Sequence, residues 1–331
     1  MTRNVLLAAV TTVFVLAAGI YFAPSRRDRV AVVPHLPAAM AAADGVIEPP
    51  FIMFRALAPR EAHGRVSMVS AAAPALTRYV SKLACTRVHY AAGTGICFIE
   101  EPEGTTIKHV ALFFDRQFKG GARFALSGLP IRARLSPDGR RAAITVYGEE
   151  HLPSGAERLA TDTVIVDVGT GRVVADLGQF AVESSSAQLT GPLDVSSVAF
   201  GPDADRFYAT LSTDVERYLV VGSLAGRRLK VVATGSASEA LSPDGKRLVI
   251  KKRVGNRGSW QLLVLDLATQ REQALNQGQR SVDDQVEWLD DEHVVYHEAT
   301  GEGTGIWVVA ADGQTPPRLL VADAYSPSVQ R

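Results

Sequence analysis

Short apolar runs separated by polar turns recur along the chain from about residue 50 to its end. The runs are rich in Val, Ile, Leu and aromatic residues, and the breaks between them hold Gly, Pro, Asp or Ser, which together indicate strands. Residues 142–147, 162–168 and 172–174 form one such series, with a further short strand ahead of it. The series recurs about every 40–50 residues, and four short antiparallel strands in such a unit are typical of a β-propeller blade.

A short phrase near the start of these units predicts their first turn. Leu-Ser-Pro-Asp-Gly followed by Arg or Lys stands at 135–140 and 241–246, and an altered copy, Phe-Gly-Pro-Asp-Ala-Asp, stands at 200–205. Proline presets the first corner, Asp bonds to the nearby backbone, and Gly accepts a left-handed conformation. We therefore predict blade turns built from Ser136, Pro137, Asp138, Gly139, Pro202, Asp203, Ser242, Pro243, Asp244 and Gly245.

The ends of the chain determine the number of blades. Residues 51–54 and 65–69 resemble strands of an incomplete first blade, and 325–329 resembles a strand without a unit of its own. A propeller must close its ring or leave exposed sheet edges, so we predict that the last strand completes the first blade. Five further units, with turns that include Ala92–Gly95 and Leu289–Glu292, then give an all-β, six-bladed propeller over 51–331, with seven blades as the alternative. Asp and Glu replace Pro and Gly at Leu289–Glu292, so that turn must be built differently.

The turn phrase and its flanks resemble the repeats of TolB-like proteins, soluble propellers of bacterial envelopes with PD40/WD40-like repeats. The resemblance is specific at Ser136–Gly139 and Ser242–Gly245 and loose elsewhere. It implies six blades and a role in envelope assembly or in transport across the envelope. The chain departs from the family pattern because only residues 30–50 are available for a separate amino-terminal α/β domain. The resemblance therefore does not imply that this chain couples to other Tol components.

The first 29 residues have a different pattern. Residues 4–23 carry no charge, and arginines follow at 26, 27 and 29. Twenty apolar residues can span a membrane as a helix, so we predict an uncleaved signal anchor within 1–29. A cleaved signal peptide is the alternative, with Ala17-Ala18-Gly19 as a weak cleavage site. Residues 30–50 are predicted to be a linker, and the propeller is expected on the extracytoplasmic side of the plasma membrane, or in the periplasm or secreted if cleavage occurs.

The two cysteines of the chain, Cys85 and Cys97, flank the predicted turn at 92–95. In an exported chain two such neighbours favour a disulfide. The chain has 35 basic and 35 acidic residues, so its charge gives no indication of nucleic-acid binding. The basic runs 227–230 and 251–253 fall at turns and strand ends, where we expect a solvated face.

The sequence offers little catalytic chemistry. It contains no Gly-x-Ser-x-Gly nucleophile elbow, and His293 and His297 lie along a predicted strand, where four residues span about 13 Å and cannot share a metal. An acidic cluster with Asp283, Asp284 and Glu287 lacks the spacing of a calcium loop, so we expect a solvated edge. We predict no catalytic, cofactor or metal residues.

The leading hypothesis is a non-catalytic, extracytoplasmic TolB-like propeller that binds a protein or peptide partner in the bacterial envelope. One alternative is a lactonase-like propeller with a metal in its axial channel, which needs several Asp, Glu, Asn or His side chains from different blades. Asn occurs only at positions 4, 256 and 276, which weakens that pattern. Another is a membrane-tethered sensor or structural domain. Polar insertions at 149–160 and 183–192 lengthen one interval between turns and are expected to form loops, either on a binding face or as growth that the fold tolerates.

Overall fold

The computed structural model describes residues 39–151, 157–183, 189, 193–254, 259–275, 282, 284–300 and 303–331. The chain divides into two units, Met1–Leu36 and Pro37–Arg331, and the second contains all of the described residues. Within them no helix is long and apolar enough to cross a membrane. The predicted anchor at residues 4–23 lies outside the described residues.

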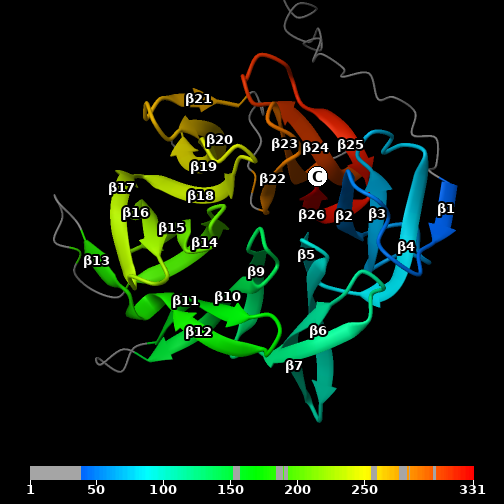
Figure 1. Cartoon of the computed structure of the whole chain (residues 1–331), viewed down its shortest axis with the longest axis horizontal. Helices are drawn as coiled ribbons and strands as arrows, with labels where there is room; N and C mark the ends of the chain where they lie inside the picture. Colours follow the sequence, from blue (N-terminus) through cyan, green and yellow to red (C-terminus); the bar gives the residue numbers. More distant parts are fainter. Residues whose placement is uncertain are drawn as a thin grey trace, which may run out of the picture. The chain divides into compact units, whose positions relative to one another are not determined.

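Six sheets surround a common axis; the first strand of the sheet is innermost in blades 2, 3, 5 and 6, β14 (Asp194–Phe200) is innermost in blade 4, and the last strand of the chain is innermost in blade 1 (Figure 1). Blade 1 consists, from the axis outward, of β26 (Ala324–Gln330), β2 (Phe51–Ala56), β3 (Arg65–Ser70), β4 (Thr77–Ala84) and β1 (Ala39–Ala42). Blade 2 consists of β5 (Arg87–Ala91), β6 (Thr94–Glu103), β7 (Thr106–Phe114) and β8 (Gly120–Ala125). Blade 3 consists of β9 (Leu129–Leu135), β10 (Arg141–His151), β11 (Glu157–Asp167) and β12 (Arg172–Asp176).

The other three blades repeat the same order. Blade 4 consists of β14 (Asp194–Phe200), β15 (Arg206–Ser212), β16 (Arg217–Ser223), β17 (Arg228–Thr234) and β13 (Ala181–Glu183), which follows the short 3-10 helix η1 (Leu177–Gln179). Blade 5 consists of β18 (Ser236–Leu241), β19 (Arg247–Val254), β20 (Ser259–Asp266) and β21 (Glu272–Ala274). Blade 6 consists of β22 (Val286–Trp288), β23 (His293–Thr300), β24 (Gly303–Ala310) and β25 (Arg318–Ala322). The predicted six-bladed propeller is confirmed.

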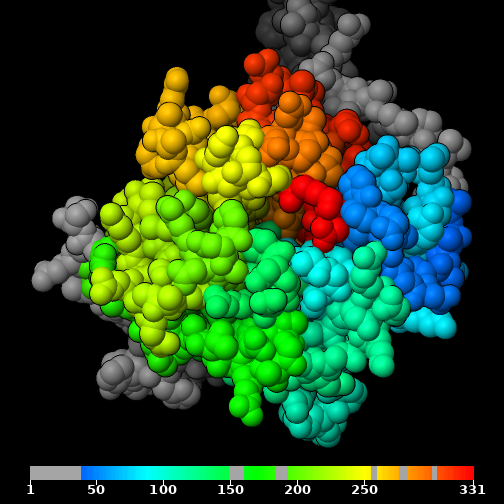
Figure 2. Space-filling model, in the orientation of Figure 1, coloured from blue at the N-terminus to red at the C-terminus, as the bar shows by residue number. Residues whose placement is uncertain are grey.

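The last strand closes the ring, as predicted. β26 pairs antiparallel with β2, with Ile52 opposite Val329 and Met53 opposite Ser328. In the space-filling view the C-terminal residues (red) lie against the first strands of the propeller (blue) (Figure 2). The chain therefore joins its first and last strands in one blade.

The main cores lie between neighbouring blades, which explains why some strands are apolar at every position. Phe51 and Met53 on one face of β2 pack against blade 2, whereas Ile52 and Phe54 on the other face pack against blade 6. Side chains alternate between the faces of a strand, so a strand buried on both faces needs a continuous apolar run.

Two blades carry a fifth, outermost strand that the sequence analysis missed. β1 runs parallel to β4, and β13 runs parallel to β17. β1 lies inside the predicted linker at 30–50, so that interpretation was wrong for residues 39–50. Ala43 is buried, and the Val46 N–H donates to the carbonyl oxygen of Arg116 in blade 2.

The predicted insertions also differ from expectation. Residues 149–151 and 157–160 are not a loop, because they extend β10 and β11 in register as far as His151 opposite Glu157. Residue 183 ends β13, while residues 184–188 and 190–192 lie outside the described residues.

The predicted turns at 136–139 and 242–245 join the first and second strands of blades 3 and 5. In each turn the serine hydroxyl donates to the Asp carboxylate and accepts from an Arg N–H, at 3.0 Å for Arg141 and 2.9 Å for Arg247. In the altered copy Gly201 has no hydroxyl, and the Asp203 carboxylate accepts the equivalent N–H, that of Arg206, at 3.0 Å. These connections lie at one end of the ring, called here the turn end. The opposite end carries the connections between second and third strands and is called here the hairpin end.

The turn at 289–292 is built differently, as expected. The Leu289 N–H donates to the His293 carbonyl oxygen, which closes a turn one residue shorter than that between Ser136 and Arg141. The Asp290 carboxylate accepts the N–H groups of Glu292 and His293, both at 2.7 Å. An Asp one position earlier thus replaces the Asp of the common phrase.

Candidate functional site

Charged side chains from the inner strands converge on the propeller axis. Glu287 on β22 is buried and accepts hydrogen bonds from Arg134 of β9 and from His89 of β5. The His89 Nε2 lies 3.2 Å from the Glu287 carboxylate, while its Nδ1 accepts the Leu135 N–H at 3.2 Å. This pattern requires a neutral imidazole with its proton on Nε2. Three blades therefore meet at one carboxylate.

The environment of this group favours a charged carboxylate beside a neutral histidine. Burial lowers the pKa of His89, and the neighbouring Glu287 opposes that effect only in part. Burial disfavours the charged form of Glu287, but Arg134 and the His89 hydrogen bond outweigh it and lower the pKa of Glu287 to about 2. Glu287 is therefore a charged carboxylate that accepts hydrogen bonds from Arg134 and from the neutral His89.

Two further carboxylates have cationic partners at the axis. Glu239 on β18 binds the Arg132 guanidinium at 2.7 Å and the Lys251 ammonium at 3.2 Å. Asp284, just before β22, pairs with Arg87 of β5. The Lys251 ammonium also donates to the Asp284 backbone carbonyl at 2.8 Å, which links the two pairs. These charged groups at the axis are thus linked to each other by hydrogen bonds and ion pairs.

Buried charges correct two of the sequence-based interpretations. Lys251 belongs to a basic run, and Asp284 and Glu287 to an acidic cluster, for which solvated surfaces were expected. All three are buried. Asp283, another member of that acidic cluster, lies outside the described residues. The partners of Asp284 and Glu287 lie on other blades. Lys251 bonds to Glu239 of its own blade and to the backbone of Asp284 near blade 6, so the local sequence does not reveal these pairs.

This convergence bears on the lactonase-like alternative. Acidic and imidazole side chains from different blades do meet at the axis, as a metal site would require. However, the carboxylates of Glu239, Asp284 and Glu287 each bind Arg or Lys. Across the described residues, no group of three or more His, Cys, Asp or Glu side chains has the arrangement needed to hold a metal ion. Each of these carboxylates therefore has at least one oxygen bonded to a guanidinium or ammonium group.

The other predicted residues have structural roles. Cys85 and Cys97 form a disulfide, which ties the connection between blades 1 and 2 to β6. In the blade turns, the arginines that follow the phrase reach the next blade: Arg141 donates to the Ala204 carbonyl oxygen at 2.9 Å, and Arg247 to that of Asp291 at 2.7 Å. The repeated phrase therefore both forms the turn and links neighbouring blades at the turn end.

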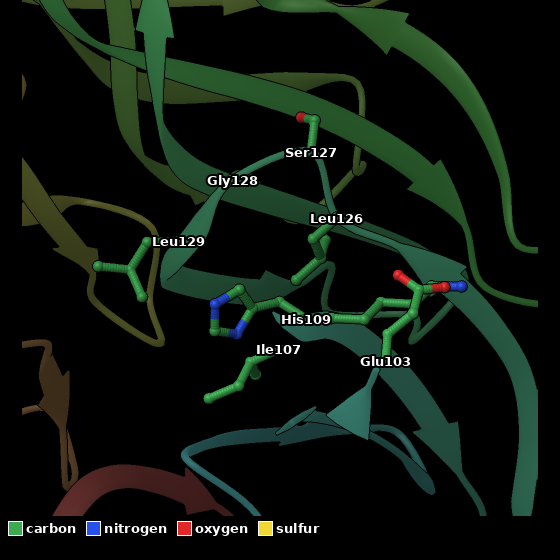
Figure 3. A pocket seen from close by; sticks show the side chains of 8 residues that line it. Glu103, Ile107, His109, Leu126, Ser127, Gly128 and Leu129 are labelled. Carbon is green, nitrogen blue, oxygen red and sulfur yellow. The ribbon is translucent and has the colours of Figure 1, made fainter. Parts of the chain in front are cut away.

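A cleft of about 440 Å³ opens between blades 2 and 3 at the hairpin end. Figure 3 shows the imidazole of His109 among the side chains of Ile107, Leu126 and Leu129. Ile107 and Leu129 are large apolar residues with exposed fractions of 61% and 55%. Tyr147, opposite Leu129 in the sheet, is 45% exposed. Such a concentration of exposed apolar side chains is typical of a binding surface.

An incomplete sheet edge borders this cleft. β8 pairs with β7 only between Val110 and Phe114, although β7 begins at Thr106. The Leu126 N–H, just after β8, donates to the His109 carbonyl oxygen of β7. Beyond Leu126 the chain turns away from β7 and continues into β9. Residues 106–108 thus have no strand on this side among the described residues. Unpaired strand edges are places where another extended chain can add.

Comparison with solved structures places this architecture among TolB propellers. TolB from Acinetobacter baumannii matches with a TM-score of 0.58 and 15% identity over 85% of this chain and 66% of that chain. A protein described as a TolB from Agrobacterium tumefaciens matches with a TM-score of 0.51 and 10% identity, over 84% and 90%. The chain has a TolB-like propeller fold.

Other comparisons set the limits of that likeness. A chain of the nidogen–laminin complex matches with a TM-score of 0.52 and 8% identity, over 85% of this chain and 97% of that one. At such identities the similarity concerns the fold alone. This chain spans just under two thirds of Acinetobacter TolB. No family model matches the sequence, so the PD40 repeat stays a prediction, and no curated protein matches it significantly.

Proposed function

We propose that this TolB-like propeller is a non-catalytic protein- or peptide-binding module of the bacterial envelope. The cleft between blades 2 and 3 carries the proposal, because it combines exposed Ile107 and Leu129 with an unpaired edge of β7. An extended segment of a partner would add to that edge through backbone hydrogen bonds and place an apolar side chain over the two residues. The paired charges at the axis support a binding role over catalysis.

A photo-crosslinking residue placed at Leu129 tests the proposal in intact cells. We expect a discrete adduct with an envelope protein, which Ile107→Asp abolishes because a charge enters the apolar contact. The matched control places the same crosslinker at Val173, an exposed residue of β12 in blade 3. An equal adduct at Val173, or none at Leu129, would contradict the proposed surface. Stoichiometric, tightly held calcium or zinc in the purified protein would favour the lactonase-like alternative.

An extracytoplasmic location, with residues 4–23 as the membrane anchor, is part of the proposal. The disulfide between Cys85 and Cys97 supports it, since such bonds persist mainly in oxidising compartments. Protein taken directly from the envelope should resist alkylation until it is reduced, and should fractionate with membranes unless residues 4–23 are deleted. Free thiols in the envelope protein would contradict the proposed location.

A further inference from the structure

Two arginines from neighbouring blades stack on one tryptophan at the hairpin end. Arg253 on β19 lies directly opposite Trp260 on β20, and its guanidinium carbon is 4.9 Å from the centroid of the Trp260 ring. Arg217, the first residue of β16 in blade 4, lies 5.1 Å from the same centroid. Trp260 therefore holds both guanidinium groups at the junction of blades 4 and 5.

The charges of these two arginines are not neutralised within the described part of the chain. Two other surface arginines, Arg123 and Arg228, have carboxylate partners there, in Glu101 and Glu183. Neither Arg217 nor Arg253 forms an ion pair with a described residue. A guanidinium stacked on a ring keeps the N–H groups at its edge available to a carboxylate.

The neighbouring acidic residues do not neutralise the positive charges of Arg217 and Arg253. The Glu216 carboxylate accepts the backbone N–H of Arg217 at 2.8 Å and makes no ion pair with its guanidinium. Asp214 is exposed at the tip of the same turn. Lys252, which alternates with Arg253 along β19, binds Glu272. Among the described residues, the two stacked guanidiniums are cations of this junction that have no ion pair.

An exposed apolar side chain near the arginines distinguishes a protein partner from a small anion. Val215, at the tip of the turn before β16 and two residues before Arg217, is 90% exposed. Exposed apolar residues beside unpaired arginines are typical of the contact areas of protein interfaces, in which arginine is enriched.

We propose that Arg217 and Arg253, positioned by Trp260, form a docking site for an acidic segment of a protein partner. Carboxylates of that segment bind the guanidinium edges, and an apolar residue of the segment contacts Val215. The inference rests on the proposed binding function, because it names a chemical property of the partner. It concerns blades 4 and 5, so it can fail independently of the cleft between blades 2 and 3.

A fluorescent hexapeptide of alternating Glu and Val tests the site against the purified full chain, with a Gln-and-Val peptide for comparison. Arg217→Gln with Arg253→Gln should raise the Kd for the Glu peptide about tenfold or more. Arg140→Gln with Lys246→Gln, two exposed residues at the turn end, removes the same charge and should change it less than about twofold. The variant with Arg217→Lys and Arg253→Lys should bind the Glu peptide with an intermediate Kd, because lysine keeps the charge but lacks the planar guanidinium.

Several outcomes would overturn the proposal. They are the absence of Glu-peptide binding, equal binding of the Gln peptide, and equal effects of the two charge-removing pairs. Binding of phosphatidylglycerol vesicles that depends on both arginines, without peptide binding, would assign the site to a lipid surface instead. Circular dichroism and thermal unfolding establish that the variants are folded. Ile107→Asp should leave Glu-peptide binding unchanged, which separates this test from that of the cleft.

Discussion

The buried imidazole of His89 links three blades through a single protonation state. Its Nδ1 accepts the Leu135 N–H, and its Nε2 donates to Glu287. Protonation of Nδ1 would make it a hydrogen-bond donor that faces the Leu135 N–H, which is also a donor. The pKa of His89 is lowered by burial, so as the pH falls below about 6.5 the unfolded chain takes up the proton first. The stability that neutral His89 contributes is therefore complete above about pH 6.5 and is lost as the pH falls below that value.

We predict that His89→Gln reduces this pH dependence. The free energy of urea unfolding of the parent should fall between about pH 7 and 5, and the variant should show a shallower fall because an amide takes up no proton. At pH 8 the variant should lose about 1–2 kcal/mol, since the Leu135 N–H loses its acceptor. Parallel curves for the two proteins would show that another group causes the slope.

Glu287 should give a second, more acidic loss of stability. Its pKa of about 2 lies below the ordinary value of 4.5, so its contribution is present above about pH 4.5 and is lost as the pH falls toward 2. Glu287→Gln removes the carboxylate and leaves Arg134 buried, which should cost about 3–5 kcal/mol at neutral pH. Urea unfolding at pH 7 measures the loss, and a change below about 1 kcal/mol would contradict it.

At this scale the sequence predicted the cysteine pair and the turn residues but not the charged axis. Cys85 and Cys97 are close in sequence on either side of one turn, so their proximity follows from local structure. Glu287 and Arg134 are separated by 153 positions. Their contact depends on how six blades close around an axis, and a charged residue in a short strand has the same local pattern whether it faces water or a buried partner.

At the scale of elements, the glycines of the two Ser-Pro-Asp-Gly turns have different surroundings. Gly139 has a φ of 69° and Gly245 a φ of 70°, so alanine is strained at both by about 1–2 kcal/mol. A Cβ at Gly139 would lie 3.0 Å from the Ala91 carbonyl oxygen of blade 2, whereas at Gly245 the nearest atom is 3.6 Å away, in the Pro202 ring. The same turn is therefore more tightly packed in blade 3.

Gly139→Ala should consequently destabilise the protein more than Gly245→Ala, by about 1 kcal/mol or more, because the contact adds to the backbone strain. Urea unfolding of the two variants beside the parent measures the difference. Ala204, with a φ of 55° in the third turn, shows that alanine can adopt this conformation. Equal losses for the two variants would mean that the Ala91 carbonyl moves aside at little cost.

Elements with a repeated pattern could be predicted, and the short additions could not. Strands such as 142–147 recur with the same turn ahead of them, so the repeat supports each assignment. β1 and β13 contain four and three residues, and their pattern of exposed and partly exposed positions resembles a loop. They form because a parallel edge on β4 or β17 is available, which is a property of the assembled blade.

At the scale of the whole molecule, β26 holds the ring together in two directions. It pairs with β2 within blade 1, and its serines bond to the backbone of β5 in blade 2. The Ser328 hydroxyl accepts the Tyr90 N–H at 2.9 Å, and the Ser326 hydroxyl accepts the Val88 N–H at 3.3 Å. The Gln285 side chain of blade 6 donates to the Pro327 carbonyl oxygen at 2.7 Å. Closure therefore involves three blades.

Deleting residues 324–331 should destabilise the propeller by more than about 4 kcal/mol, beyond the effect of most point substitutions. The deletion uncovers the inner edge of β2 and leaves backbone groups of β5 without partners, so the truncated protein should also associate as its concentration rises. Ser326→Ala with Ser328→Ala is the matched control: it keeps the strand, should cost about 2 kcal/mol, and should stay monomeric. Urea unfolding and sedimentation velocity measure both effects. A truncated protein as stable and as monomeric as the full chain would show that the ring holds without its last strand.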